Sequence, residues 1–364
     1  MALSTFWNHS GELHQLEGFT QSIKHWEPGE PLEDIQQVLL QQLENIFGKE
    51  VVLEVEYSDG HQAIVRMPTA TSNSDGDIVQ DLSWFTREVA LLQWLEANEV
   101  AIPVPRVLAT VHGSESEPYT FSVIEKMSGD CILNVFGALS FDIKESIIRN
   151  MANFMLRLNS VDVPQQIGST AVRGNALDLV PLVPISLTIT YPRVFDTLEE
   201  YMLYLVQLKR ESDSVGSDDD CLTRANGVLD RLLEMLPALL QRLSSTVYRR
   251  CVLNHDDLNE ANVLVNSDGD ITGVIDWEYQ SVRPVVLAAQ YPCYLRYDGI
   301  YHDPRFASVI KAQNKDYWHA LVDGELLRQV EEWLTDRNPD PGCAALGRWM
   351  DEAFASQPPV EVKV

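Results

Sequence analysis

Three oxygen-bearing side chains in the second half of the chain have the types and the spacing for chemistry on phosphate groups. Asp257 lies in the segment His255–Asn262, which ends in an amide, and Asp276 follows further along the chain. Carboxylate and amide oxygens suit a hydrated Mg²⁺, because that ion takes few protein ligands and keeps water and phosphate for its remaining positions. The neighbouring sequence holds no set of imidazole and thiolate groups for zinc. These residues therefore predict a site for magnesium and phosphate.

A hairpin is the element that must position these side chains. The apolar runs Asn262–Val265 and Ile271–Ile275 flank the turn Asn266–Asp270, which contains Asn, Asp and Gly. Because polar residues stand at both ends of the hairpin, folding would bring the two aspartates and the asparagine to one edge. The H-x-D-x-x-x-x-N spacing followed by Asp is also the arrangement of phosphoryl-transferring kinases, in which the first Asp accepts the hydroxyl proton and the other two residues hold metal.

The region upstream, residues 48–127, is predicted to be a small mixed β lobe with one inserted helix. β-Branched residues alternate around an Asp-Gly turn, and a later segment has apolar residues at helical spacing. The predicted elements are two strands within 50–68 joined by the turn Ser58–Gly60, a polar surface loop over Thr69–Asp77, a helix over 82–99, and strands within 101–111 and 119–129.

The remaining chain is predicted to be mainly helical, which makes the fold class α+β. Apolar stripes predict helices over 31–47, from Ile143 to Leu158, from Leu229 to Leu243 and from Ala345 to Phe354, with an acidic loop over Glu211–Asp220. The expected domains are an N-terminal helical extension (1–47), the small β lobe (48–127) and a helical lobe (128–364) that carries the hairpin.

The charge of the chain excludes several classes of partner. Among 364 residues, 27 Lys and Arg stand against 54 Asp and Glu, which gives a formal charge of −27 at pH 7. Such a surface repels nucleic-acid backbones and anionic membranes and favours cationic or neutral small molecules. Five cysteines without a CxxC pair indicate neither a disulfide framework nor zinc. With no signal sequence and no long apolar run, a cytoplasmic location is expected.

The paired segments His255–Asn262 and Ile275–Glu278 resemble the signature of the aminoglycoside phosphotransferase (APH) and choline-kinase-like family, and are similar to its fungal branch. The likeness covers about residues 48–295. A protein kinase would carry Asp-Phe-Gly and a later Ala-Pro-Glu, and neither follows here. The resemblance therefore implies a small-molecule kinase that uses ATP and Mg²⁺, with a bilobal protein-kinase-like fold of a small N-terminal β lobe and a larger, mainly helical C-terminal lobe.

The same resemblance implies roles for individual residues in the second half of the chain. Asp257 corresponds to the catalytic base, and His255 to a residue that supports its loop. Asn262 and Asp276 correspond to the magnesium ligands. The acceptor would be a hydroxyl group on a small molecule.

In the β lobe, the resemblance implies nucleotide-binding residues. Arg66 falls where the family has a phosphate-pairing strand lysine, and Glu88 falls where the helix glutamate pairs with it. Glu125 and Met127 belong to a hinge segment whose backbone would hydrogen-bond adenine.

Three departures from the family pattern leave alternatives open. The glycine-rich phosphate loop is reduced to Gly48, Arg66 replaces lysine, and Asp256 replaces a frequent glycine and adds a charge beside the base. One alternative is a catalytically impaired kinase-like binding or regulatory protein. A weaker one is a metal-dependent hydrolase that uses His255, Asp256 and Asp257, although it would need more ligands.

Overall fold

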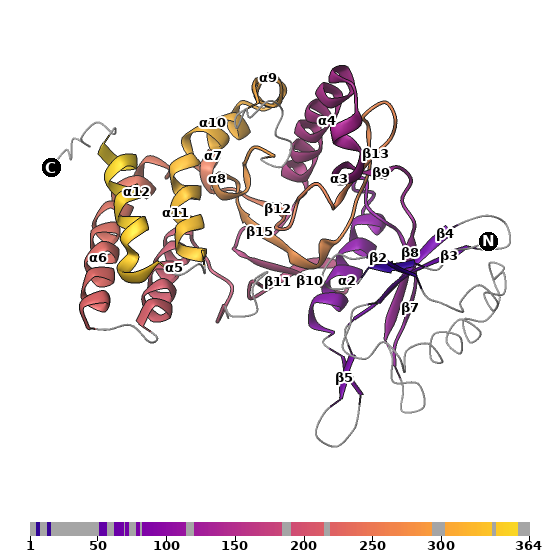
Figure 1. Ribbon diagram of the computed structural model, residues 1–364, viewed down its shortest axis with the longest axis horizontal. Coiled ribbons are helices and arrows are strands. Elements are labelled where there is room, and N and C mark those ends of the chain that lie inside the picture. The colour runs from indigo at the N-terminus through magenta and orange to yellow at the C-terminus, as the bar shows by residue number, and fades with distance from the viewer. Residues whose placement is uncertain are drawn as a thin grey trace. The chain divides into compact units, whose positions relative to one another are not determined.

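The computed structural model describes most of the chain after residue 50 (Figure 1). The described residues are 5–7, 13–15, 51–56, 62–68, 70–72, 78–80, 82–113, 120–183, 191–214, 219–292, 303–336 and 340–355. The predicted helix over 31–47, the turn Ser58–Gly60 and Gly48 lie outside these ranges. The chain divides into two compact units: Met1–Ile147, Ala171–Leu177 and Asp257–Tyr279 form the first, and Ile148–Thr170, Asp178–Asp256 and Gln280–Val364 form the second.

The first unit contains the predicted β lobe. Its four-stranded antiparallel sheet has the order β3-β4-β8-β7. The strands and their helix are β3 (Val51–Glu56), β4 (Gln62–Met67), β7 (Val107–Val111), β8 (Phe121–Glu125) and α2 (Ser83–Ala97). Phe85, Leu91 and Leu95 on α2 are buried, as the helical spacing predicts. These strands and the helix confirm the predicted secondary structure of the lobe.

Two short hairpins add to this unit. The prediction of a loop over Thr69–Asp77 is wrong in part, because β5 (Ala70–Ser72) pairs antiparallel with β6 (Ile78–Gln80). The backbone N–H and C=O groups of such a polar segment can bond either to water or to a neighbouring strand. Composition alone therefore does not distinguish a loop from a short strand. Residues 1–47, predicted as a helical extension, contain the antiparallel pair β1 (Thr5–Trp7) and β2 (Leu13–Gln15).

The predicted late hairpin also lies in the first unit. The strands β13 (Val263–Val265) and β14 (Ile271–Val274) pair antiparallel, and β9 (Asp130–Cys131) pairs with β13. In the turn, Asn266 Oδ1 accepts hydrogen bonds from the backbone of Asp268 and Asp270 at 3.0 and 2.9 Å. Gly129, before β9, has φ +104°, and a Cβ there would lie 2.7 Å from the carbonyl oxygen of Val265. The hairpin prediction is confirmed.

A second sheet, which includes the strand that ends at His255, was not predicted. It has the order β11-β10-β15-β12, with β10 (Gly168–Arg173), β11 (Ala176–Val180), β12 (Cys251–His255) and β15 (Gln280–Pro284). β12 and β15 pair antiparallel over five residue pairs. All five residues of β12 are buried, and a short, fully buried run has no periodicity that separates a strand from a helix.

Helices make up most of the second unit. In chain order, the helices after the β lobe are α3 (Ile132–Val135), η2 (Phe136–Ala138), α4 (Phe141–Ser160), α5 (Leu198–Ser214), α6 (Asp219–Arg242), α7 (Thr246–Arg249), η3 (Trp277–Tyr279), α8 (Val285–Ala288), α9 (Pro304–Gln313), α10 (Lys315–Asp323), α11 (Glu325–Thr335), η4 (Pro341–Cys343) and α12 (Ala344–Ala355). η3 belongs to the first unit, as do α3 and η2. The predicted α+β class is confirmed, and no described helix is long and apolar enough to cross a membrane.

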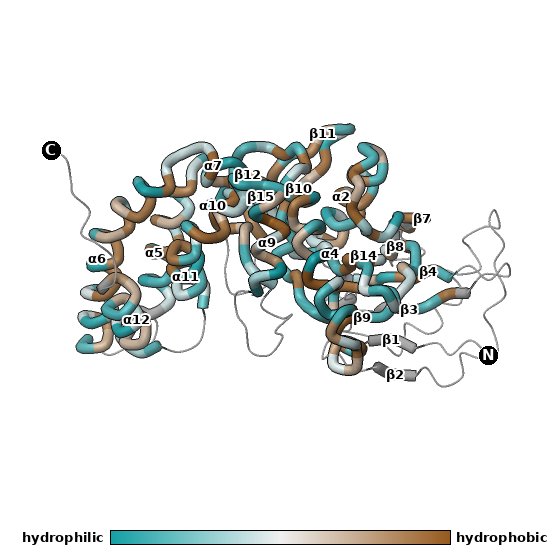
Figure 2. Tube along the Cα trace, turned by 90° about the horizontal axis from the view of Figure 1, so that it is seen from above, coloured by the Kyte–Doolittle hydropathy of each residue, from teal (hydrophilic) through white to brown (hydrophobic). Residues whose placement is uncertain are grey.

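The core of the second unit follows the leucine stripe of α6. Leu229, Leu232 and Leu236 are fully buried and belong to one core cluster with residues of α5, α11 and α12. Figure 2 shows both hydrophobic and hydrophilic residues along α6, as expected of a helix with one buried face. The predicted acidic loop over Glu211–Asp220 is shorter than expected. α5 continues to Ser214 and α6 begins at Asp219, because the charged residues at these helix ends remain exposed to water without leaving the helix.

Candidate active site

The loop between β12 and β13 fixes the carboxylate of Asp257 with its own side chains. The amide nitrogen of Asn262 donates to Asp257 Oδ2 at 3.1 Å and to the Asp257 carbonyl oxygen at 2.8 Å. The amide nitrogen of Asn259 donates to Asp257 Oδ1 at 3.1 Å. Both carboxylate oxygens therefore receive a hydrogen bond, which holds the side chain in one orientation.

The hairpin brings Asp276 to the same end as Asn262. The backbone N–H of Ile275 donates to the carbonyl oxygen of Asn262 at 3.0 Å, so that Asp276 directly follows a residue bonded to Asn262. Asp276 has φ +67°, a left-handed conformation that non-glycine residues rarely adopt. Such a turn redirects the chain after β14, and the Asp276 side chain remains 32% exposed. The structure thus gathers the three residues that the spacing predicts.

The donor set at this end of the hairpin fits a magnesium ion. Asn262 directs its amide nitrogen to Asp257, and no hydrogen bond between described residues is donated to its Oδ1. Within the described ranges, no cluster of three or more His, Cys, Asp or Glu side chains is placed to hold a metal. Two carboxylates and one amide oxygen are a sparse set, which suits an ion that keeps water and phosphate among its ligands.

Arg66 on β4 is buried among three carboxylates. Its Nη1 donates to Glu88 Oε1 at 2.6 Å, and its Nη2 lies 3.0 Å from Asp276 Oδ1 and 3.6 Å from Glu278 Oε2. Among these contacts, three carboxylates stand against one guanidinium. A partly exposed carboxylate in such surroundings favours a nearby cation.

Glu278 is a partner of Arg66 that the sequence reasoning missed, although it stands in the Asp-Trp-Glu motif. Each residue of the motif contacts the Arg66–Glu88 pair: Asp276 and Glu278 approach Arg66, and the backbone N–H of Trp277 donates to Glu88 Oε1 at 3.0 Å. Trp277 is fully buried, as expected of a packing residue. Burial and the neighbouring carboxylates of Glu278 and Asp276 raise the pKa of Tyr279 to about 12.

The predicted hinge residues lie at the end of β8: Glu125 is its last residue and stands opposite Ala63 of β4, and Met127 follows the strand. The backbone N–H of Glu125 donates to the carbonyl oxygen of Arg106 at 2.8 Å, and its side chain pairs with the Arg106 guanidinium. Met127 packs against Gly273, where an added Cβ would lie 2.9 Å from Met127 Cβ. Among described residues, the backbone groups of Met127 have no hydrogen-bond partner, whereas the amide of Glu125 is occupied.

His255 and Asp256 belong to the second unit. His255 is the buried last residue of β12 and stands opposite Gln280 of β15. Asp256 Oδ1 accepts a hydrogen bond from Asn254 Nδ2 at 2.5 Å and lies 3.9 Å from Arg283 Nη1. Asp256 is therefore compensated by its own partners, and it does not stand as an unpaired acid beside Asp257.

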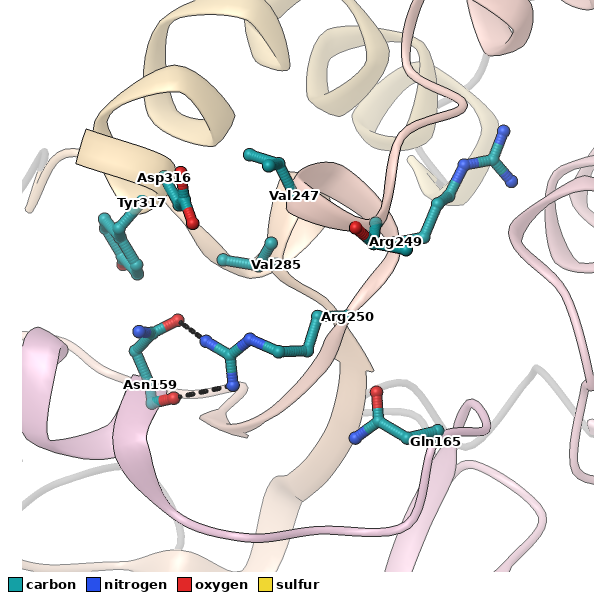
Figure 3. A pocket seen from close by; sticks show the side chains of 9 residues that line it. Asn159, Gln165, Val247, Arg249, Arg250, Val285, Asp316 and Tyr317 are labelled. Atoms are coloured by element: carbon teal, nitrogen blue, oxygen red, sulfur yellow. Dashed lines mark hydrogen bonds between the residues drawn. The ribbon is translucent and has the colours of Figure 1, made fainter. Parts of the chain in front are cut away.

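The second unit also contains a pocket of about 380 Å³ (Figure 3). None of the predicted site residues lines it. The guanidinium of Arg250 crosses the pocket and donates to both the backbone and the side-chain oxygen of Asn159, whereas the side chain of Arg249 extends away from it. Arg250 is thus committed to Asn159, and the pocket is separate from the predicted site residues.

Comparisons with known proteins identify the family. The model of the APH phosphotransferase enzyme family matches residues 55–286. Clavilactone A biosynthesis cluster protein Y of Ampulloclitocybe clavipes is 37% identical over 381 residues, with 94% of each chain covered. Among solved structures, ADP-bound aminoglycoside phosphotransferase APH(2'')-Ib is 16% identical with a TM-score of 0.47, covering 82% of this chain and 86% of that one. APH(4)-Ia is 14% identical with a TM-score of 0.46, covering 84% and 86%. Since the family model spans well over half of its length, this chain belongs to the APH phosphotransferase enzyme family.

Proposed function

We propose that this phosphotransferase is an ATP- and Mg²⁺-dependent kinase that transfers the γ-phosphoryl group to a hydroxyl group of a small molecule. The observation that carries the proposal is the end of the β13–β14 hairpin. There Asn262 holds the Asp257 carboxylate with its amide nitrogen, and its backbone carbonyl bonds the residue before Asp276. This arrangement supplies one carboxylate for the acceptor and two oxygen ligands for a cation.

Asp257 is the proposed catalytic base. Its carboxylate, oriented by Asn259 and Asn262, would accept the proton of the acceptor hydroxyl as that oxygen approaches the γ-phosphorus. The transition state of phosphoryl transfer is loose, so that most of the rate enhancement would come from orientation and charge neutralisation. A fixed carboxylate suits this task better than a mobile one. His255, buried at the end of β12, would support the loop.

Asn262 and Asp276 are the proposed magnesium ligands, through the amide oxygen of the first and the carboxylate of the second. A bound magnesium ion would neutralise phosphate charge. Arg66 would contact the phosphates, for which its planar guanidinium offers two parallel donors. Because Asp276 now accepts a hydrogen bond from Arg66, nucleotide binding would redistribute these partners while Glu88 keeps its 2.6 Å contact.

The adenine base would bind the backbone of the segment that follows β8. Met127 is the better candidate there, because the amide of Glu125 already donates to Arg106. For the acceptor, the chain charge of −27 favours a cationic or neutral alcohol over an anionic one, and argues against nucleic acid or an anionic membrane as partner. We expect the enzyme to act in the cytoplasm.

Phosphate transfer from Mg-ATP to a panel of amino alcohols and neutral alcohols tests the proposal. Asp257→Asn should lower the transfer rate by at least about a hundredfold, since a positioned proton acceptor contributes 10²–10⁴. Asp268→Asn, at the exposed turn of the same hairpin, is the matched control and should leave the rate unchanged. Equal rates for wild type and Asp257→Asn contradict the assignment of the base.

Thermal unfolding with and without Mg-ATP tests the nucleotide separately. A nucleotide at 100 times its dissociation constant should stabilise the wild type by about 2.7 kcal/mol. Stabilisation without transfer to any alcohol would favour the kinase-like binding protein over the kinase. If Mg-ATP neither stabilises the protein nor gives phosphate transfer to any alcohol, the whole proposal is contradicted.

A further inference from the structure

A second buried arginine cluster lies in the unit that carries Asp256. Arg283 Nη2 on β15 donates to Glu331 Oε1 on α11 at 2.7 Å, and the hydroxyl of Tyr201 on α5 donates to the same oxygen at 2.7 Å. On its other side, Arg283 Nη1 lies 3.9 Å from Asp256 Oδ1. Two helices and one strand therefore meet at the Arg283–Glu331 pair, and Arg283 links that pair to the residue that immediately precedes the proposed base.

The burial of this cluster makes its charge pairing necessary. The Arg283 and Glu331 side chains are only 17% and 11% exposed, and Tyr201 is fully buried. A buried guanidinium without carboxylates is very unfavourable, and the same holds for the carboxylates without it. Burial lowers the pKa of Arg283, but the charges of Glu331 and Asp256 outweigh burial and leave that pKa above its ordinary value. The Arg283 guanidinium thus remains charged at any working pH.

The strand register places a second support for Asp256 on the same face of the sheet. In the β12–β15 ladder, Val252 stands opposite Arg283 and Asn254 stands opposite Ser281. Residues directly opposite each other project from one face, and so do alternate residues of one strand. Arg283 and Asn254 therefore share a face, and both approach Oδ1 of Asp256. The side chains of Asn254 and Arg283 thus hold Asp256 at the start of the loop.

From these contacts we infer that Arg283 is a positioning residue of the proposed phosphotransfer: by pairing with Asp256 and Glu331, it fixes the start of the loop whose next residue is Asp257. The inference rests on the proposed function. Arg283 contacts none of the reacting groups. It acts through Asp256, which is joined to the base by a single peptide bond, so that displacement of Asp256 displaces the Asp257 backbone.

Another buried arginine of the same unit offers a matched control. Arg328 on α11 is also largely buried, and its guanidinium donates to the backbone carbonyls of Val286, Ala320 and Leu321. These partners are backbone groups of α8 and α10 and do not belong to the loop that carries Asp257. Arg328→Met should therefore destabilise the fold without a specific effect on the loop.

The test compares Arg283→Met, Arg283→Lys and Arg328→Met in the full chain by two measurements. The first is amide hydrogen exchange of residues 254–262, and the second is Mg-ATP turnover, analysed as kcat and KM separately. Arg283→Met should raise exchange in 254–262 about tenfold and lower kcat about tenfold with the KM for Mg-ATP unchanged. Arg283→Lys keeps the charge and should recover most of kcat. Arg328→Met should change neither kcat nor exchange in 254–262.

Each outcome decides the inference. If Arg283→Met behaves like Arg328→Met, with lower stability but normal loop exchange and kcat, Arg283 is only structural and the inference is overturned. If Arg283→Met does not fold, Asp256→Asn is the second variant, because it keeps the Arg283–Glu331 pair and should still lower kcat and raise loop exchange. If the wild type shows no turnover, the proposed function fails, and unchanged exchange in 254–262 would then separately refute the anchoring by Arg283.

Discussion

Each of the two units contains a buried arginine with carboxylate partners. The two arginines differ in how many carboxylates approach them and in how exposed those carboxylates are. Arg66 in the first unit has three carboxylates, of which Asp276 is 32% exposed and lies at the end of the hairpin. Within the described ranges, Arg283 in the second unit has one close carboxylate, that of Glu331 at 2.7 Å, with Asp256 at 3.9 Å. The first cluster has surplus acids and access to solvent, whereas the second is nearly balanced and closed.

A buried arginine with carboxylate partners can therefore serve two purposes. In both clusters a buried guanidinium needs carboxylates, because an unpaired buried charge is strongly unfavourable. A surplus of exposed acid allows partners to be exchanged, which suits the binding of a cation and of phosphates. A balanced and closed cluster resists any exchange, which suits a fixed support. Substitutions and changes of pH should therefore affect the two clusters differently.

The largest effect is expected from Glu331→Gln. It leaves the Arg283 guanidinium with only the distant carboxylate of Asp256, so that the free energy of unfolding should fall by about 3–5 kcal/mol. Glu88→Gln is the matched change in the first unit. It leaves Arg66 with two carboxylates and should lower the free energy of unfolding by less. Denaturant unfolding at pH 7 measures both, and equal losses would remove the distinction between the clusters.

A slightly smaller effect is expected from Arg66→Met, on nucleotide use. Loss of a positioned donor to a transferring group commonly lowers rates 10²–10³-fold, which is about 2.7–4 kcal/mol. We expect a decrease of about that size in kcat/KM for Mg-ATP. Arg283→Met should leave the KM for Mg-ATP unchanged. The comparison fails if both arginine variants lose nucleotide affinity to the same extent.

Alkaline pH should affect the closed cluster through Tyr191, which stacks on Tyr201. Burial raises the pKa of Tyr191 to about 12, against about 10 in the unfolded chain. A raised pKa means that the contribution of this residue to stability is complete below pH 10 and is lost as the pH rises toward 12. Denaturant midpoints between pH 9 and 11.5 should therefore fall less steeply for Tyr191→Phe than for wild type. Identical slopes would show that Tyr191 ionises normally.

The smallest effect is expected from Glu278→Gln. At 3.6 Å, Glu278 is the most distant of the three acids around Arg66, and its removal should lower the free energy of unfolding by less than about 1 kcal/mol. It also removes repulsion toward phosphates, so that metal-free ATP should bind about threefold tighter in calorimetric titration. Glu96→Gln, at an exposed position of α2, is the control. Weaker binding of ATP would contradict the view that the Arg66 cluster holds surplus negative charge.

Local patterns in the sequence predicted the elements that depend on local physics. The leucine stripe from Leu229 to Leu243 predicts a helix face, and each of its predicted leucines is buried in the structure. The Asn-Ser-Asp-Gly-Asp turn between two apolar runs predicts the β13–β14 hairpin, because Asn266 satisfies the turn backbone with its own side chain. The hairpin then brings Asn262 next to Asp276 through short-range pairing.

The spacing within the motifs determined the candidate site, but the roles of its residues remain proposals. Asp257 and Asn262 are close enough in sequence for one loop to join them. Asp276 reaches the same end as Asn262 because the β13–β14 hairpin lies between these two residues in the sequence. The β12–β15 sheet could not be predicted in the same way, because β12 is buried on all sides and β15 lies on the far side of the hairpin in sequence.

The family, the α+β composition and the local order of the motif residues could be predicted from the sequence, because helical stripes, turns and short spacings each depend on a few neighbouring residues. Which distant charges meet depends on how the elements pack. Tyr201 and Glu331 are 130 positions apart, and Arg283 reaches Asp256 only because β15 pairs with β12. Such contacts follow from the packing of whole elements, which no short stretch of sequence specifies.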